Sequence, residues 1–151
     1  MQIYVDMDGV LADFYGHHQA VFGACPGERT DDVYWSTIRT KDFYMAVPPM
    51  PDFDELWTHI EHDTPIILTG VPEAVPESAA FKRAWVDKFI SENIELRCCP
   101  SKDKSLHCHT GDVLIDDWEK YRHLWVKAGG VWITHHSAAE TIRRLTELNI
   151  R

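Results

Sequence analysis

Two aspartates directly follow a short apolar run near the start of the chain. Residues 3–5 are Ile-Tyr-Val, and Asp6, Met7, Asp8 and Gly9 come next. One carboxylate of such a pair can attack phosphorus, while the other protonates the leaving oxygen and later activates water. Mg²⁺ prefers oxygen ligands and would screen the repulsion between Asp6 and a phosphate. The simpler alternative is that both aspartates are turn or cap residues, and an isolated pair favours that interpretation.

A second acidic pair, Asp116 and Asp117, ends another apolar run that covers residues 112–115. Adjacent acids at the end of a buried strand are costly unless they meet a cation. Acids are also favoured in the first turn of a helix, so this pair alone fits either interpretation.

Between the acidic pairs lie residues that suit a phosphate group. Thr69 and Gly70 offer a hydroxyl and a free backbone N–H after an apolar run, and residues 101–105 contain Lys102 and Lys104. A lysine there could neutralise phosphate and keep an aspartate ionised. A single lysine in a solvated loop gives the same pattern, so the order of the motifs along the chain is the stronger signal.

Short apolar runs predict the strands that position these residues. The expected strands are residues 3–5, 66–68, 94–98, 112–115 and 131–133. Helical spacing of apolar residues separates them, which predicts an α/β fold with a doubly wound parallel sheet. Sites in such sheets lie beyond the carboxyl ends of the strands. Asp6, Thr69, Asp116 and Asp117 fall at those ends, so we expect them to meet.

Each expected helix has one apolar face. The patterns are Phe53, Leu56, Trp57 and Ile60 after a capping box of Asp52 and Glu55; Phe81, Ala84, Trp85, Lys88 and Phe89; Trp118, Tyr121, Leu124, Trp125 and Ala128 before Gly129; and Ile142, Leu145 and Leu148 after a cap at Ser137. Residues from about 15 to 53 do not fit a strand–helix unit and are rich in aromatics and acids. We interpret them as a small, mostly helical cap inserted after the first strand of a single domain, residues 1–151.

Composition sets further limits. The 151 residues are 44% hydrophobic, which suits one compact domain, and the net charge of −9 argues against a broad surface for duplex nucleic acid. An acidic protein that handles phosphate needs local positive charge, which a metal ion and one lysine would supply. The start of the chain does not have the pattern of a signal peptide, and no long apolar run occurs, so we expect no membrane segment. We interpret the four cysteines as reduced thiols of a cytoplasmic protein.

Taken in order, the motifs resemble those of the haloacid dehalogenase superfamily of phosphatases. The first motif, residues 6–14 (DMDGVLADF), is the most specific part of this resemblance. Over most of its length the chain also looks like the 5'(3')-deoxyribonucleotidase family. The supporting segments are residues 41–43, 48–51, 82–89, 103–105 and 111–117. The resemblance implies the Rossmann-like core of that superfamily, a cap, and magnesium as cofactor.

The resemblance also implies roles for the first two motifs. Asp6 would be the nucleophile and a magnesium ligand. Asp8 would be the general acid and base, and its backbone carbonyl would bind the metal. Thr69 would bind phosphate, together with Gly70 and Lys104. The family often has a second hydroxyl residue where this chain has Gly70.

The later motifs receive roles in the same way. Lys104 would match the lysine of the family, with Lys102 as the alternative. Asp117 would bind magnesium while Asp116 pairs with the lysine, and which of these two aspartates binds the metal directly stays open. In the cap, stacking on a nucleobase is one role for three aromatic residues, and forming the core of the cap is the other. These residues are Trp35, Phe43 and Tyr44.

We therefore expect a magnesium-dependent phosphomonoester hydrolase that acts through an aspartyl-phosphate, with (deoxy)nucleoside monophosphates as substrates. One alternative is a phosphatase of the same fold for a sugar phosphate or a nucleic-acid 3'-phosphate. Another is a non-catalytic protein that binds phosphate or nucleotides. A zinc-binding module is a further alternative, although the spacing of its candidate ligands matches no usual zinc pattern. Those candidates are Cys98, Cys99, His107, Cys108 and His109.

Overall fold

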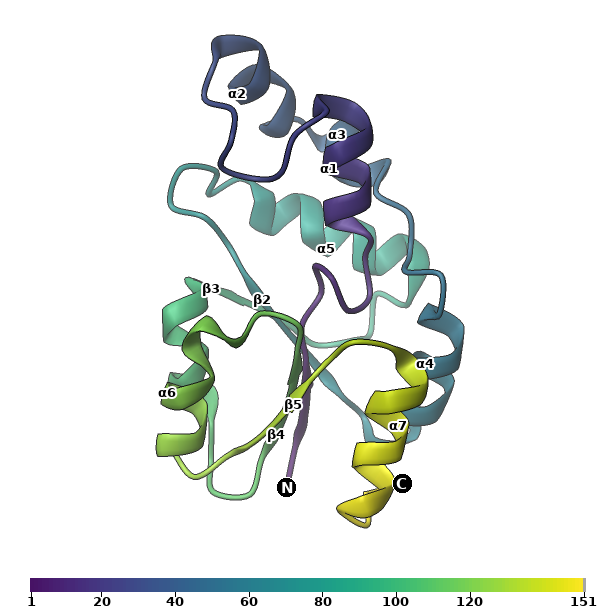
Figure 1. The fold of residues 1–151 in the computed structure, drawn as a ribbon. Helices are drawn as coiled ribbons and strands as arrows, with labels where there is room; N and C mark the ends of the chain where they lie inside the picture. The colour runs from purple at the N-terminus through teal and green to yellow at the C-terminus, as the bar shows by residue number, and fades with distance from the viewer. Residues whose placement is uncertain (151) are drawn as a thin grey trace.

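The computed structural model describes residues 1–150, and within them five parallel strands form one sheet (Figure 1). The strands are β1 (Ile3–Val5), β2 (Ile66–Gly70), β3 (Leu96–Cys99), β4 (Val113–Asp116) and β5 (Val131–Thr134), in the order β3-β2-β1-β4-β5. β1 is central, and its Tyr4 pairs with Ile66 on one side and Leu114 on the other. The five expected strands are confirmed, with ends that differ from the prediction by no more than two residues.

Helices cover both faces of the sheet, so the sheet is doubly wound (Figure 1). One face carries α4 (Phe53–Ile60), α5 (Ser78–Phe89) and α7 (Ala138–Glu147), and the other carries α6 (Arg122–Lys127). Successive strand residues point to opposite faces. Ile3 and Val5 therefore pack in the core with α4, α5 and α7, while Tyr4 packs against Trp125 of α6. Short 3₁₀-helices lie in the connections at η1 (Glu61–Asp63), η2 (Ser101–His107) and η3 (Glu119–Tyr121).

Three helices between β1 and α4 form a separate group, which we call the helical insert. They are α1 (Phe14–Phe22), α2 (Asp32–Ile38) and α3 (Lys41–Met45). Figure 1 shows them beyond the strand ends, next to α5. The insert has its own buried cluster of aromatic and aliphatic side chains, and Tyr44 packs on Phe81 of α5 with ring centroids 5.5 Å apart. The insert helices span residues 14–45, while α4, which starts at Phe53, belongs to the layer on the sheet.

Each helix of the insert begins at a side chain that accepts a hydrogen bond from the first turn. Asp13 accepts from the backbone N–H of Gly16, Asp31 from that of Tyr34, and Thr40 from that of Phe43. Such caps satisfy N–H groups that have no partner within the helix. These local bonds explain how a segment with little apolar periodicity still forms short helices.

The predicted capping box at the start of α4 is wrong. Asp52 makes no side-chain cap there, because its Oδ2 accepts a hydrogen bond of 2.7 Å from the backbone N–H of Ala138 at the start of α7. The predicted cap at Ser137 is confirmed, since its hydroxyl accepts from the N–H of Glu140 at 3.3 Å. Two side chains therefore cap α7, and one of them ties it to the neighbouring α4.

The buried faces of two helices differ from the prediction. In α5, Lys88 is exposed and Lys82 is buried beside Trp85 and Val86. The helix expected over residues 118–128 is also shorter, because α6 begins at Arg122 and leaves Trp118 outside it. Gly129, with a φ of +94°, follows the end of α6 as predicted. Lys82 and Trp118 both lie near the carboxyl ends of the strands, because Lys82 bonds to Thr69 and Trp118 bonds to Asp116.

None of the helices within residues 1–150 has the length and the apolar character needed to span a membrane.

Candidate active site

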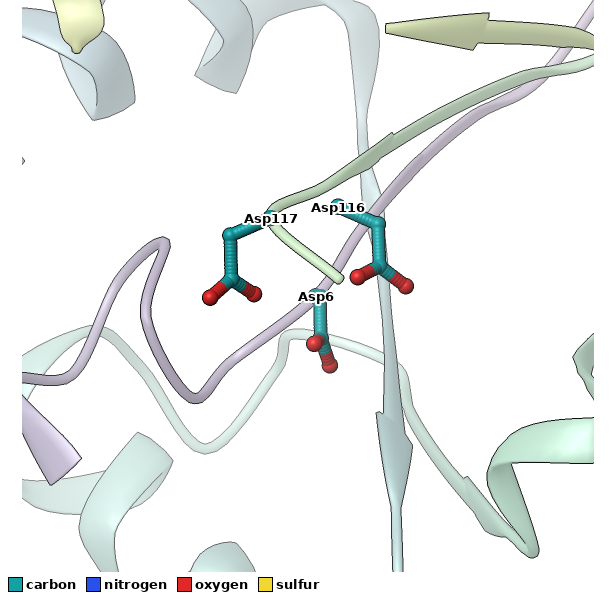
Figure 2. Close-up of side chains that lie close together, drawn as sticks. All are labelled: Asp6, Asp116 and Asp117. Carbon is teal, nitrogen blue, oxygen red and sulfur yellow. The ribbon is translucent and has the colours of Figure 1, made fainter. Parts of the chain in front are cut away.

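Three carboxylates meet where two neighbouring strands end. Asp6 follows β1, and Asp116 and Asp117 stand at the end of β4, which runs parallel to β1 in the next position of the sheet. Each offers an oxygen, and these oxygens lie within 4.8 Å of one another. Figure 2 shows the three side chains gathered at the strand ends. Within residues 1–150 this is the one group of three or more carboxylate, imidazole or thiol side chains close enough to share a metal ion.

Lys104, from η2, supplies the positive charge beside this cluster. Its Nζ lies 2.7 Å from Asp116 Oδ2 and 3.0 Å from Asp6 Oδ1, and the residue is only 6% exposed. Burial by itself lowers the pKa of Lys104, but the charges of Asp6 and Asp116 outweigh it, so that the pKa is raised. Lys104 therefore stays charged in the folded protein. The alternative lysine, Lys102, is exposed and makes no ion pair among the described residues.

The acidic cluster carries more negative charge than Lys104 balances. Burial, followed by the charge of Asp6, raises the pKa of Asp116 to about 6 and that of Asp117 to about 7. The buried Oδ1 of Asp117 has no hydrogen-bond partner within residues 1–150. Oxygen ligands of this kind are what Mg²⁺ prefers. The donor set and the unpartnered oxygen therefore fit a divalent cation held between Asp6 and Asp117.

A second lysine, Lys82 of α5, binds the residues of the site that do not contact Lys104. The sequence analysis gave it no role. Its Nζ donates to Asp8 Oδ2 at 2.7 Å, to Thr69 Oγ1 at 2.8 Å and to the carbonyl oxygen of Gly70 at 2.7 Å. The residue is 1% exposed. One feature of the sequence could have pointed to Lys82. It lies three residues before Trp85 on the apolar face of a helix, where a lysine needs buried partners.

Asp8 sits between the acidic cluster and Lys82. Burial raises the pKa of Asp8, and the charge of Asp6 adds to this, while Lys82 acts in the opposite direction. The carboxyl group therefore holds a proton more readily than an exposed aspartate does. A carboxyl whose pKa is raised in this way is better suited to act as a general acid than an exposed one.

Thr69 and Ser101 both carry a hydroxyl group near the carboxyl end of β2, and they differ in exposure. Thr69 is fully buried and its hydroxyl accepts from Lys82, and it does not line the cavity described below. Gly70 and Ser101 do line the cavity. A Cβ added to Gly70 would collide with the hydroxyl of Ser101. Ser101 therefore places a hydroxyl where a side chain at position 70 would stand.

A cavity of about 790 Å³ opens in front of the site. Asp6, Asp8, Lys82 and Lys104 line it at the strand ends. Its aromatic lining comes from the helical insert and from the chain after β4, and consists of Phe14, Tyr15, Tyr44, Trp118 and Tyr121.

The predicted aromatic residues of the insert divide into two groups. Tyr44 reaches the cavity, whereas Trp35 and Phe43 do not line it. Phe43 is buried in the core of the insert, and Trp35 packs beside Tyr34 with Arg39 over its ring. Phe43 therefore forms part of the core of the insert, as the alternative interpretation predicted. Trp35 packs at the edge of that core.

The turn after Asp8 depends on Gly9, which has a φ of +81°. A Cβ there would collide with the carboxylate of Asp117 and press on the ring of Tyr15. We expect Gly9→Ala to lower the free energy of unfolding by about 1–2 kcal/mol, the usual cost of this backbone region. It should also displace Asp117 and weaken Mg²⁺ binding, which isothermal titration calorimetry would measure.

Gly23→Ala is the matched control, because Gly23 has a φ of +64° and no atom within 4 Å of an added Cβ. It should cost similar stability but leave Mg²⁺ affinity unchanged. Equal Mg²⁺ affinities for the two variants would contradict the placement of Asp117 against Gly9.

The cysteine and histidine residues that could have suggested zinc do not gather. All four cysteines are free, and no zinc-like group forms within residues 1–150.

No family model matches this chain, and a search of curated proteins finds no match to it.

Proposed function

We propose that this protein is a magnesium-dependent phosphomonoester hydrolase that passes the phosphoryl group through Asp6, with nucleoside monophosphates as substrates. The observation that carries the proposal is the meeting of Asp6, Asp116 and Asp117 at adjacent strand ends with Lys104 between two of them. The resemblance of the motifs to haloacid dehalogenase phosphatases supports the same reading. The aromatic cavity in front of the carboxylates favours a substrate with an aromatic part.

In the first step, a carboxylate oxygen of Asp6 attacks phosphorus. The bond between phosphorus and the ester oxygen breaks, and the leaving oxygen takes the proton of Asp8. Lys104 and Asp116 hold Asp6 in place, because the ammonium group contacts both carboxylates. Lys82 holds Asp8 through one oxygen and leaves Oδ1 without a partner among the described residues, which is the oxygen available for proton transfer.

In the second step, Asp8 takes a proton from a water molecule, whose oxygen attacks the phosphorus of the aspartyl-phosphate. The bond to Asp6 breaks, and free phosphate leaves. Asp8 regains the proton that it gave up in the first step, so the cycle is balanced.

Magnesium fits the donor set, with Asp6, Asp117 and the backbone carbonyl of Asp8 as the residues that would hold it. When bound, the ion supplies positive charge that stabilises the phosphate oxygens. Asp116 is engaged by Lys104, so it would orient the lysine instead of binding the metal.

The test is phosphate release from deoxy- and ribonucleoside monophosphates, sugar phosphates and a 3'-phosphorylated oligonucleotide, with Mg²⁺ and after its removal by a chelator. We expect Mg²⁺-dependent release that is fastest with deoxynucleoside monophosphates. Faster release from another class would keep the chemistry of Asp6 and reject the nucleotide substrate. No release from any of them would reject the hydrolase and favour a phosphate-binding protein.

A further inference from the structure

Trp118 is exposed although its surroundings in the sequence predict a buried position. It follows Asp117 directly and was expected on the apolar face of a helix. In the structure it lies outside α6, is 48% exposed and lines the cavity in front of the carboxylates. Large aromatic side chains are usually highly buried. Packing within the protein therefore covers only part of the apolar surface of Trp118.

The position of Trp118 is nevertheless fixed by its neighbours. Its backbone N–H donates to Asp116 Oδ1 at 2.9 Å, which ties it to the acidic cluster. Its ring meets that of Tyr121 edge to face, with centroids 5.5 Å apart. Lys120 Nζ lies 5.2 Å from the centroid of Trp118 and 5.3 Å from that of Tyr121. The two rings contact Lys120 and line the cavity at the same time.

A second exposed aromatic residue lies near Asp117. Tyr15 of the helical insert is 45% exposed, lines the same cavity and lies beside Gly9 together with Asp117. The cavity that holds the carboxylates is thus lined by aromatic rings from two separate parts of the chain. A volume of about 790 Å³ is ample for one small ligand.

We propose that Trp118 and Tyr121 bind the aromatic ring of the substrate, as a platform for the nucleobase of a nucleoside monophosphate. This inference rests on the proposed function, because it takes the phosphate to lie at Asp6. Trp118 and Asp6 line the same cavity, so one ligand that carries an aromatic ring and a phosphate can contact both. Stacking of this kind tolerates different bases, so the platform recognises the class of substrate and leaves the choice of base to other contacts.

The kinetic test compares two substrates that differ only in the base. Thymidine 5'-monophosphate carries the ring, and deoxyribose 5-phosphate does not. We expect Trp118→Ala to lower kcat/KM for thymidine 5'-monophosphate by about 10- to 100-fold and to change that for deoxyribose 5-phosphate by less than about twofold. Trp118→Phe should restore most of the loss. Val126→Ala removes an apolar side chain that is 50% exposed and lies outside the cavity, and it should change neither value. Equal losses on both substrates would overturn the platform and leave the hydrolase in place.

A binding test separates failure of the platform from failure of the proposed function. Asp6→Asn and the double variant Asp6→Asn with Trp118→Ala are titrated with thymidine 5'-monophosphate and with deoxyribose 5-phosphate by calorimetry. The platform predicts a loss of affinity of about tenfold or more for the nucleotide alone, whether or not the wild-type protein turns it over. Equal nucleotide affinities in the two variants, or no nucleotide binding in either, would overturn it.

Discussion

Replacement of Asp6 by asparagine is expected to lower the rate of phosphate release by more than about 10³-fold, because a neutral amide is a poor nucleophile. The side chain keeps its size, and Lys104 keeps its 2.7 Å contact with Asp116. Loss of one negative charge also relieves the repulsion that contributes to the raised pKa values of Asp116 and Asp117. The variant should therefore unfold at a temperature no lower than that of the wild-type protein.

Asp54→Asn is the matched control for Asp6→Asn. Asp54 is an exposed residue of α4 that does not line the cavity, and its replacement should leave phosphate release unchanged. Release by the Asp6 variant within about tenfold of the wild-type rate would show that another group attacks phosphorus. Thermal unfolding followed by circular dichroism would establish that each variant is folded.

Replacement of Lys104 by methionine is expected to have the second large effect, on stability as well as activity. It removes the ammonium group between two buried carboxylates, and breaking such a buried ion pair costs about 3–5 kcal/mol. Urea unfolding without divalent ions would measure the loss. Lys104 lowers the pKa of Asp116, so without it this carboxyl takes up its proton at a higher pH than in the wild-type protein, where the pKa is about 6. The loss should therefore shrink as the pH falls from 8 toward 6, because a protonated carboxyl no longer needs a counter-charge.

Lys102→Met provides the comparison, since Lys102 lies two residues away and is exposed. Its stability should stay within about 0.5 kcal/mol of the wild-type value. Mg²⁺ should recover part of the stability lost in Lys104→Met, because a bound cation replaces some of the missing positive charge. A stability loss that is the same at pH 5 and pH 8 would contradict the assignment of Lys104 as the counter-charge of Asp116.

The strands and the acidic cluster could be predicted because both depend on short-range patterns. Apolar runs that end in aspartates place those aspartates at one edge of any parallel sheet, and Asp6, Asp116 and Asp117 do meet there. Lys104 could be matched by its order along the chain. Lys82 was missed because its three bonds are to Asp8, Thr69 and Gly70, which are 12–74 residues away in sequence.

The positions of the aromatic residues near the site also depend on contacts between residues that are distant in sequence. Periodicity placed Trp118 on a buried helical face, but the backbone bond to Asp116 keeps it in the turn before α6. Composition marked Trp35 and Phe43 as candidates for contact with a substrate, yet neither lines the cavity. Which aromatic residues of the insert pack against each other and which face outward depends on the tertiary contacts among three short helices, and no local pattern specifies those contacts.

The bond from Lys82 to Asp8 has a mechanical consequence. Lys82 belongs to α5, and the helical insert that carries Tyr44 and Tyr15 rests on the same helix through the contact of Tyr44 with Phe81. A shift of α5 would move Asp8, the proposed proton donor, together with Tyr15 and Tyr44, which line the cavity. Under the proposed function, one helix would therefore couple the wall around the substrate to the alignment of the acid, so a substitution that alters either should disturb both.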